Sequence, residues 1–140
     1  MGAETKSFPL QILTMDGKEF EGEAAGVMLR SIHGDIAILP GHINYCTGIG
    51  MGAAKVTMPD GSERRAACIG GMVSMLEGRC TIASTTWEWQ EEIDEERARA
   101  ARQKAEERLA EKNLSDKEER LATAKLQRAL VRLSVSEGKE

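Results

Sequence analysis

The sequence predicts a β + α chain, with an antiparallel β-sandwich or barrel in residues 1–90 and a pair of helices in residues 91–140. Turn signals recur about every eight to twelve residues through the first ninety, a spacing typical of short antiparallel strands. The region from 92 to 133 holds no aromatic residue, cysteine or proline. It consists mainly of Ala, Glu, Lys, Arg and Leu, which are strong helix formers.

The β segments are short apolar or alternating runs bounded by turn residues. Asp16-Gly17, Pro40-Gly41 and Glu77-Gly78 are turn pairs, and Gly70-Gly71 separates two further apolar runs. Tyr45–Gly52 is rich in glycine, which permits tight bends and close approach of backbones. We therefore expect eight to ten short strands, formed from residues 8–13, 18–23, 25–31, 36–39, 45–52, 54–58, 63–69, 72–76 and 79–85.

The β pattern ends within Trp87–Glu91, and two helices follow. Asp94 is a candidate N-cap for the first helix, and Ser115 with Glu118 forms a capping box for the second. Each helix carries one thin apolar stripe at helical spacing: Ala98, Ala101, Ala105 and Leu109 in the first; Ala122, Leu126, Ala129, Leu130 and Leu133 in the second. Helices with so little to bury are marginal alone. The hairpin should therefore rest on another surface or exchange between two resting places.

Composition narrows the class of protein. The net charge of −4 argues against a general nucleic-acid binder. Residues 92–140 carry twelve basic and twelve acidic side chains, which suits helices laced with ion pairs. Cys46, Cys68 and Cys80 form no C-x-x-C pair, so we expect small core residues in a reducing compartment.

Other sequence patterns argue against a signal peptide, a membrane span, a metal site and a catalytic site. The polar first residues indicate no signal peptide, and no apolar run approaches the roughly 18 residues of a membrane span. Any membrane association should therefore pass through a partner. His33 and His42 have no Cys or His partners nearby in the sequence, and no nucleophile or phosphate-loop motif is present. We expect no metal site and no catalytic residues.

Four motifs carry a family resemblance. They are GDIAILPGHINYCT from Gly34 to Thr47, Gly70-Gly71 within IGGMVSML, the Ile93-Asp94-x-x-Arg97-Ala98 run, and LQRALVRLSV from Leu126 to Val135. Together they resemble the epsilon subunit of bacterial-type F-type ATP synthases, called delta in mitochondria. The resemblance covers about residues 8–136. One departure is Asn44, where family members often have proline.

The resemblance implies a ten-stranded β-sandwich followed by an antiparallel α-helical hairpin. It also implies a non-catalytic subunit of the central stalk in a proton- or sodium-translocating ATP synthase. The sandwich would sit against the gamma subunit and the c-subunit ring, at the cytoplasmic face of the cell membrane. The helices would fold beside the sandwich or extend along gamma into the alpha/beta catalytic head, where they block ATP hydrolysis. By position, Asp35 and His42 fall where the family touches the c ring; we expect His42 to be exposed.

Cations of the two helices suggest an anionic ligand. Arg128 and Arg132 lie one turn apart with Lys125 nearby, and an antiparallel partner would bring Arg97 into the same region. Ordinary solvated helix charges are the alternative. The resemblance implies ATP as a regulatory ligand, with no cofactor required. The matching positions are Glu88, Ile93, Asp94, Arg97, Ala98, Lys104, Arg128 and Arg132. Lys104 replaces an arginine, which keeps the charge and loses the planar fork.

Two functions from different classes remain at this point. The first is the regulatory stalk subunit. The second is a stand-alone small-ligand, nucleotide-binding module that uses the arginines as a clamp. They differ in whether the chain travels with gamma. An enzyme using His42 and Asp35 is poorly supported, because no nucleophile or metal set accompanies them.

Overall fold

The computed structural model describes residues 6–138. Seven strands precede a short 3₁₀ turn and two long helices. The elements are β1 (Phe8–Thr14), β2 (Glu19–Ala24), β3 (Gly26–Ser31), β4 (Gly34–Ile38), β5 (Tyr45–Thr57), β6 (Glu63–Leu76), β7 (Arg79–Trp89), η1 (Gln90–Glu92), α1 (Glu95–Ala110) and α2 (Asp116–Ser136).

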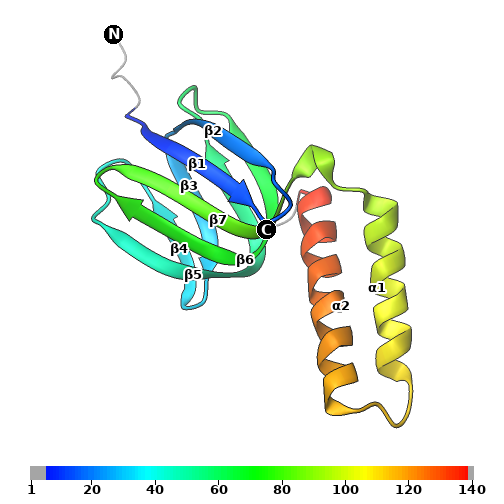
Figure 1. The fold of residues 1–140 in the computed structure, drawn as a ribbon. Helices are drawn as coiled ribbons and strands as arrows, with labels where there is room; N and C mark the ends of the chain where they lie inside the picture. Colours follow the sequence, from blue (N-terminus) through cyan, green and yellow to red (C-terminus); the bar gives the residue numbers. More distant parts are fainter. Residues whose placement is uncertain (1–5, 139–140) are drawn as a thin grey trace.

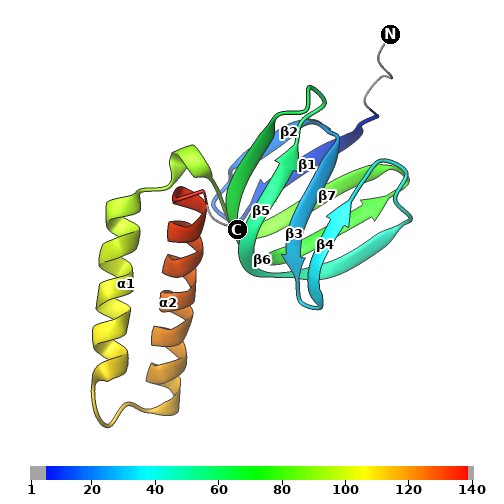
Figure 2. The same cartoon turned by 180° about the vertical axis from the view of Figure 1, so that it is seen from behind.

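The strands form one sheet in the order β2-β1-β7-β6-β5-β3-β4, and this sheet folds over on itself. Strands β1, β2 and β7 face the viewer in Figure 1, whereas β3 and β4 face the viewer in Figure 2. The core fills the space between the two layers, with Leu10, Ile82 and Val56 nearly inaccessible to solvent. The sandwich predicted from the sequence is confirmed.

The strand number is seven rather than about ten, because β5, β6 and β7 are long and pass through the folded sheet without ending. Gly70-Gly71, predicted as a break between strands, lies inside the 14-residue β6. Both glycines have positive φ, +73° and +121°, so the strand bends there. The β5–β6 register is the same on both sides of this bend. Likewise, residues 45–52 and 54–58, expected as two strands, form the single strand β5 apart from Met58.

One pairing departs from the antiparallel expectation. Strands β1 and β7 run parallel, with Leu10 opposite Cys80 and Leu13 opposite Ala83. Every other neighbouring pair in the described sheet is antiparallel. Because this pair joins the first and last strands, the sandwich includes a contact between residues about seventy positions apart in the chain.

Two of the three cysteines are core residues as predicted. Cys68 and Cys80 are buried, and burial raises the pKa of each thiol to about 11, so both stay protonated at neutral pH. Cys46 is exposed, so the prediction is wrong for this residue. It alternates with the buried Thr47 along β5 and therefore points to the outer face.

The helical hairpin begins where the sequence predicts. The Asp94 carboxylate accepts the Arg97 N–H at 3.1 Å, and Ser115 and Glu118 cap each other's backbone N–H groups. Ala98 and Ala105 are the buried residues of α1, which face α2 through a seam of small side chains. Two residues of the expected stripes, Ala101 and Leu130, are exposed instead.

The hairpin rests on the sandwich through the C-terminal half of α2, which contacts β5 and β6 (Figure 1). Arg132 Nε lies 2.5 Å from Glu88 Oε1 on β7, and Arg65 donates to the Gly138 carbonyl at 3.0 Å. Helix α1 lies on the far side of α2 (Figures 1 and 2), so α2 carries the main attachment.

Side-chain contacts hold the linker η1 to the sandwich. Arg64 of β6 pairs with Glu91 at 2.6 Å and lies over the Trp89 ring at 3.8 Å. Glu92 accepts the Trp89 N–H at 3.0 Å and lies 3.5 Å from Lys18. The Ile93 N–H also donates to the Gln90 carbonyl at 3.3 Å, so the turn stays bonded up to the residue before the N-cap Asp94. None of the helices described within residues 6–138 is long and apolar enough to cross a membrane.

Candidate functional site

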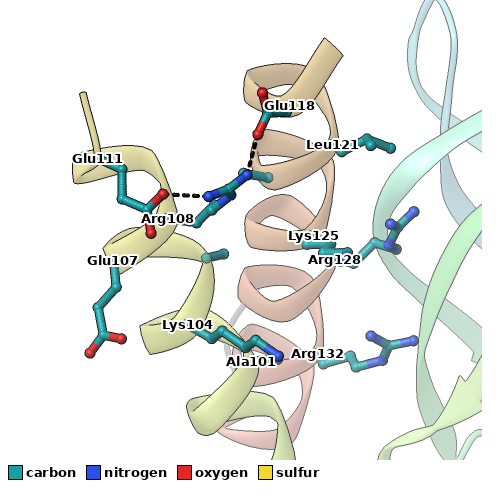
Figure 3. Close-up of a pocket in the computed structure, with 12 residues that line it drawn as sticks. Ala101, Lys104, Glu107, Arg108, Glu111, Glu118, Leu121, Lys125, Arg128 and Arg132 are labelled. Carbon is teal, nitrogen blue, oxygen red and sulfur yellow. Dashed lines mark hydrogen bonds and ion pairs between the residues drawn. The ribbon is translucent and has the colours of Figure 1, made fainter. Parts of the chain in front are cut away.

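A groove of about 720 Å³ runs along the hairpin between α1 and α2 (Figure 3). We call it the hairpin groove. Its walls come from both helices: Ala101, Lys104, Ala105, Glu107, Arg108 and Glu111 from α1 and its C-cap; Glu118, Leu121, Ala122, Lys125, Arg128 and Arg132 from α2. The groove exists because the facing side chains are alanines, which leave the long charged side chains to frame an open space.

The hairpin groove is cationic on balance, with five basic and three acidic side chains. Arg108 pairs with both Glu111 and Glu118 across the hairpin turn, as Figure 3 shows. Glu107 accepts from Gln103. Among residues 6–138, Lys104, Lys125 and Arg128 have no acidic partner. The groove therefore presents cations that an anionic ligand would neutralise.

A second cavity, of about 480 Å³, adjoins the hairpin groove and shares Ala101 and Arg132 with it. We call it the linker cavity. It lies where the hairpin meets the sandwich, and both contribute to its lining: Asp16, Lys18, Thr86, Glu88, Glu92, Asp94, Arg97, Ala98, Ala101 and Arg132. Four of these side chains are carboxylates, so the two joined cavities differ in electrostatic character.

Most of the residues predicted to bind a ligand line one of the two cavities. Lys104, Arg128 and Arg132 line the hairpin groove. Glu88, Asp94, Arg97, Ala98 and Arg132 line the linker cavity. Arg132 therefore connects the two, and its ion pair with Glu88 joins two predicted ligand residues 44 positions apart. Ile93 is half-buried and lines neither cavity.

The structure adds residues that the sequence analysis did not identify. Lys18, Asp16 and Thr86 reach the linker cavity from the sandwich, and Arg108 lines the tip of the hairpin groove. Lys18 and Asp16 belong to the turn between β1 and β2, about 80 residues before the helix they face. Nothing in the local sequence pattern connects that turn to the hairpin, since tertiary contacts such as Lys18–Glu92 bring them together.

The two residues predicted to contact a partner ring lie at opposite ends of β4, with Asp35 beside the β3–β4 turn and His42 in the loop between β4 and β5. Asp35 is exposed and pairs with Arg30 at 3.1 Å. His42 is only half-exposed; its Nδ1 lies 2.8 Å from the Ile43 carbonyl, and its ring packs edge-on against Tyr45. The His42 ring was expected to be exposed. It is only partly exposed, because Tyr45 and the Ile43 carbonyl cover part of it.

The Asn44 side chain ties this loop to a neighbouring turn. Its Oδ1 accepts the Glu77 N–H at 2.8 Å, and Glu77 has the left-handed φ of +49° that begins the β6–β7 turn. The chain neighbours of these two residues, Ile43 and Leu76, are exposed apolar side chains. This end of the sandwich is therefore both fixed in position and apolar at its surface.

The outer face of the sheet carries a second apolar surface. Leu13, Ala83, Met72 and Gly48 lie side by side on neighbouring strands β1, β7, β6 and β5. Ile32 covers Gly48, whose added Cβ would come within 3.2 Å of its side chain. Leu13, Met72 and Ile32 are 36%, 50% and 64% exposed, so this row, which we call the outer apolar row, faces solvent. Within residues 6–138 no cluster of His, Cys, Asp and Glu is arranged to hold a metal ion.

The fold and its site define a class: a β-sandwich that carries a cation-lined helical hairpin. Comparison with known families identifies the family of this chain. Residues 7–90 match the model of the beta-sandwich domain of the ATP synthase delta/epsilon chain, and residues 91–137 match the model of the long alpha-helix domain of the same chain. The chain belongs to this family. Members are accessory chains of the ATP synthase, so the protein is a subunit without catalysis of its own.

The sequences of individual relatives match almost the whole chain. The ATP synthase epsilon chain of Exiguobacterium sp. is 37% identical over 131 residues, which cover 94% of this chain and 96% of the relative. That of Caldicellulosiruptor bescii is 38% identical over 130 residues, 93% of each chain. A chain in the Euglena gracilis mitochondrial ATP synthase structure (OSCP/F1/c-ring) has a TM-score of 0.80 at 18% identity, covering 97% of this chain and 84% of that one. This last likeness concerns the fold.

Proposed function

We propose that the protein is the epsilon subunit of a proton- or sodium-translocating ATP synthase, in which it couples the rotor to the catalytic head and restrains ATP hydrolysis. In this proposal the sandwich docks on the gamma subunit and the c ring, at the cytoplasmic face of the membrane. The helices leave the sandwich, extend along gamma into the alpha/beta head, and block hydrolysis there.

The surfaces of the sandwich support the docking part. The outer apolar row spans four strands, and a contiguous exposed apolar surface on a folded domain is typical of a protein interface. The loop between β4 and β5, which carries the exposed Leu39 and Ile43, offers a second contact separate from the hairpin. Both surfaces remain open while the hairpin is docked on β5 and β6, so the sandwich is free to hold the rotor in either helical state.

The observation that supports inhibition by the helices is the small contact between the hairpin and the sandwich. Helix α1 buries two alanines, and α2 meets the sandwich mainly through its C-terminal half. The Arg132–Glu88 ion pair that accompanies this contact is only partly buried, with side chains 29% and 21% exposed. The side-chain ties of the linker to the sandwich reach Glu92, and the backbone bond of Ile93 to Gln90 follows, so a swing of the hairpin would begin near Asp94.

A complex assembled with a chain ending at Glu92 tests this proposal. We expect the shortened subunit to copurify with gamma and the c ring, because the sandwich and linker ties are intact. We expect ATP hydrolysis by that complex to rise several-fold over the complex with the full chain, because the helices are absent. Hydrolysis that stays equally low would refute inhibition by the hairpin, and loss of copurification would refute docking by the sandwich.

We further propose that ATP bound to the folded hairpin regulates this inhibition. The hairpin groove supplies unpaired cations for phosphates, and the linker cavity supplies carboxylates that accept hydrogen bonds from amino and hydroxyl groups. A ligand that binds only the folded hairpin stabilises it by RT ln(1 + [L]/Kd), about 2.7 kcal/mol at a hundredfold excess over Kd. When ATP falls, the helices are released and hydrolysis of the remaining ATP is restrained.

Titration calorimetry of the isolated chain with millimolar MgATP tests the ligand. We expect saturable heat for the wild type and an affinity at least about tenfold weaker for Arg128→Ala, because a charge-assisted hydrogen bond contributes roughly 1.5–3 kcal/mol. Arg120→Ala is the matched control, since Arg120 is an exposed arginine of α2 outside the hairpin groove. No heat with wild type, or equal loss in both variants, would refute ATP sensing and leave the stalk role intact.

A further inference from the structure

Two consecutive arginines of β6 hold the two ends of the helical hairpin. Arg64 pairs at 2.6 Å with Glu91 of η1, the segment through which the chain enters the hairpin. Arg65 Nη1 donates to the carbonyl of Gly138, just beyond the end of α2, at 3.0 Å. Neighbouring side chains of a strand point to opposite faces, so the two arginines reach these ends from opposite sides of β6. One strand therefore carries both attachments.

The two ends of the hairpin also lie beside each other. A Cβ added at Gly138 would lie 3.9 Å from Gln90 Nε2 of η1. Ser136 Oγ donates to Glu95 Oε2 at 3.1 Å, which joins the last residue of α2 to the first residue of α1. Figures 1 and 2 show the linker and the C-terminal end of α2 at the same end of the hairpin, next to the sandwich. Both contacts with β6 are therefore made at the base of the hairpin.

The two attachments differ in what release of the hairpin would do to them. Arg64 contacts Glu91 and, at 3.8 Å, the ring of Trp89 on β7, and both of these residues precede α1. These contacts can persist when the helices leave. Arg65 donates to backbone that follows α2, where carbonyls carry partial negative charge and lack helical partners. That bond must break when α2 moves away from the sandwich.

We propose that Arg65 is a latch, a residue that favours the docked hairpin, and that Arg64 is a pivot, a residue that keeps the linker on the sandwich in both helical states. Both are positioning residues for the inhibition of hydrolysis proposed above, and the regulatory part of this inference rests on that function. Loss of the latch increases the fraction of chains with released helices. Loss of the pivot loosens the linker itself.

Hydrogen exchange of the purified full chain, read by mass spectrometry, tests the latch. For Arg65→Gln we expect exchange across α1 and α2 to be about fivefold faster than in the wild type, which corresponds to about 1 kcal/mol, with unchanged protection of the strands. Arg65→Lys should restore most of the protection, because an ammonium group also donates to a carbonyl. Arg30→Gln is the matched control, since it removes a 3.1 Å ion pair with Asp35 that involves no hairpin residue.

Tryptophan fluorescence separates the pivot from the latch. The chain has two tryptophans, Trp87 and Trp89, and Arg64 covers the ring of Trp89. Arg64→Gln should move the emission to longer wavelength, because the ring gains contact with water, and should speed exchange in residues 90–93. Arg65→Gln should do neither. An equal change of emission in both variants would show a general loosening of this end of the sandwich and would overturn the separate roles.

The remaining outcomes distinguish the latch from the proposed function. Helix exchange in Arg65→Gln that is no faster than in Arg30→Gln would overturn the latch. With faster exchange, ATP hydrolysis by a complex assembled with Arg65→Gln should fall several-fold below that of the wild-type complex, because released helices are more common. Faster exchange with unchanged hydrolysis would overturn inhibition by the hairpin, while the latch on the isolated chain would stand.

Discussion

Gly71→Ala should unfold the protein or lower its free energy of unfolding by at least about 3 kcal/mol. The reason is steric and conformational together. A Cβ at this position would lie 2.1 Å from the Ala83 carbonyl oxygen and 2.7 Å from the Ser84 Cα, which are backbone atoms of β7 that cannot move aside. The φ of +121° is also one that residues with a side chain rarely adopt.

Thermal and urea denaturation of the purified variant measure this effect. Gly61→Ala is the matched control, because Gly61 has a φ of +90° with no atom within 4 Å of the added Cβ. It should therefore show only the conformational cost, about 1 kcal/mol. If Gly71→Ala loses no more stability than Gly61→Ala, β6 does not approach β7 as closely at this bend as the structure has it.

Val135→Asp should release the hairpin from the sandwich without unfolding the sandwich. Val135 is fully buried in the last turn of α2, the helix that contacts β5 and β6, and lies outside the core cluster between the two sheet layers. A carboxylate there would be desolvated without a partner, at a cost of several kcal/mol. Because few contacts attach the hairpin to the sandwich, we expect that cost to exceed the free energy that favours the docked state.

Hydrogen exchange read by mass spectrometry distinguishes release from general unfolding. In Val135→Asp we expect protection to be lost across α1 and α2 and retained in β5, β6 and β7. Leu130→Asp is the control, since Leu130 is 45% exposed on the same helix and its side chain already faces water. Loss of protection throughout both domains would show that hairpin and sandwich unfold as one cooperative unit, contrary to a releasable hairpin.

The helix boundaries could be predicted from sequence because the signals that set them are local. Asp94 and Ser115 cap backbone groups within three residues of themselves, so a short stretch of sequence contains the whole interaction. The glycine pair at 70 and 71 shows the opposite case. A bend within a strand and a turn between strands both need positive φ, so the same residues predict either. Pairing with β7 decides between them.

The candidate site was predictable on the hairpin and not on the sandwich. Arg128 and Arg132 follow helical spacing, which sequence displays directly, whereas Lys104 came from the family resemblance. Lys18 and Asp16 reach the linker cavity because α2 docks beside the β1–β2 turn, a tertiary contact with no sequence period. The exposure of His42 was likewise not predictable. Its ring packs against Tyr45 and lies beside the Ile43 carbonyl, and a Pro-Gly-His run does not indicate these contacts.

The parallel pairing of β1 with β7 has a consequence for the order of folding during synthesis. The N-terminal strand has no second neighbour until residues 79–89 have left the ribosome, because its partner on that side is the last strand made. Contacts so distant in sequence close slowly. The pairing of β1 with β7 therefore closes only after the other strands of the sheet have been made, while α2 still awaits synthesis.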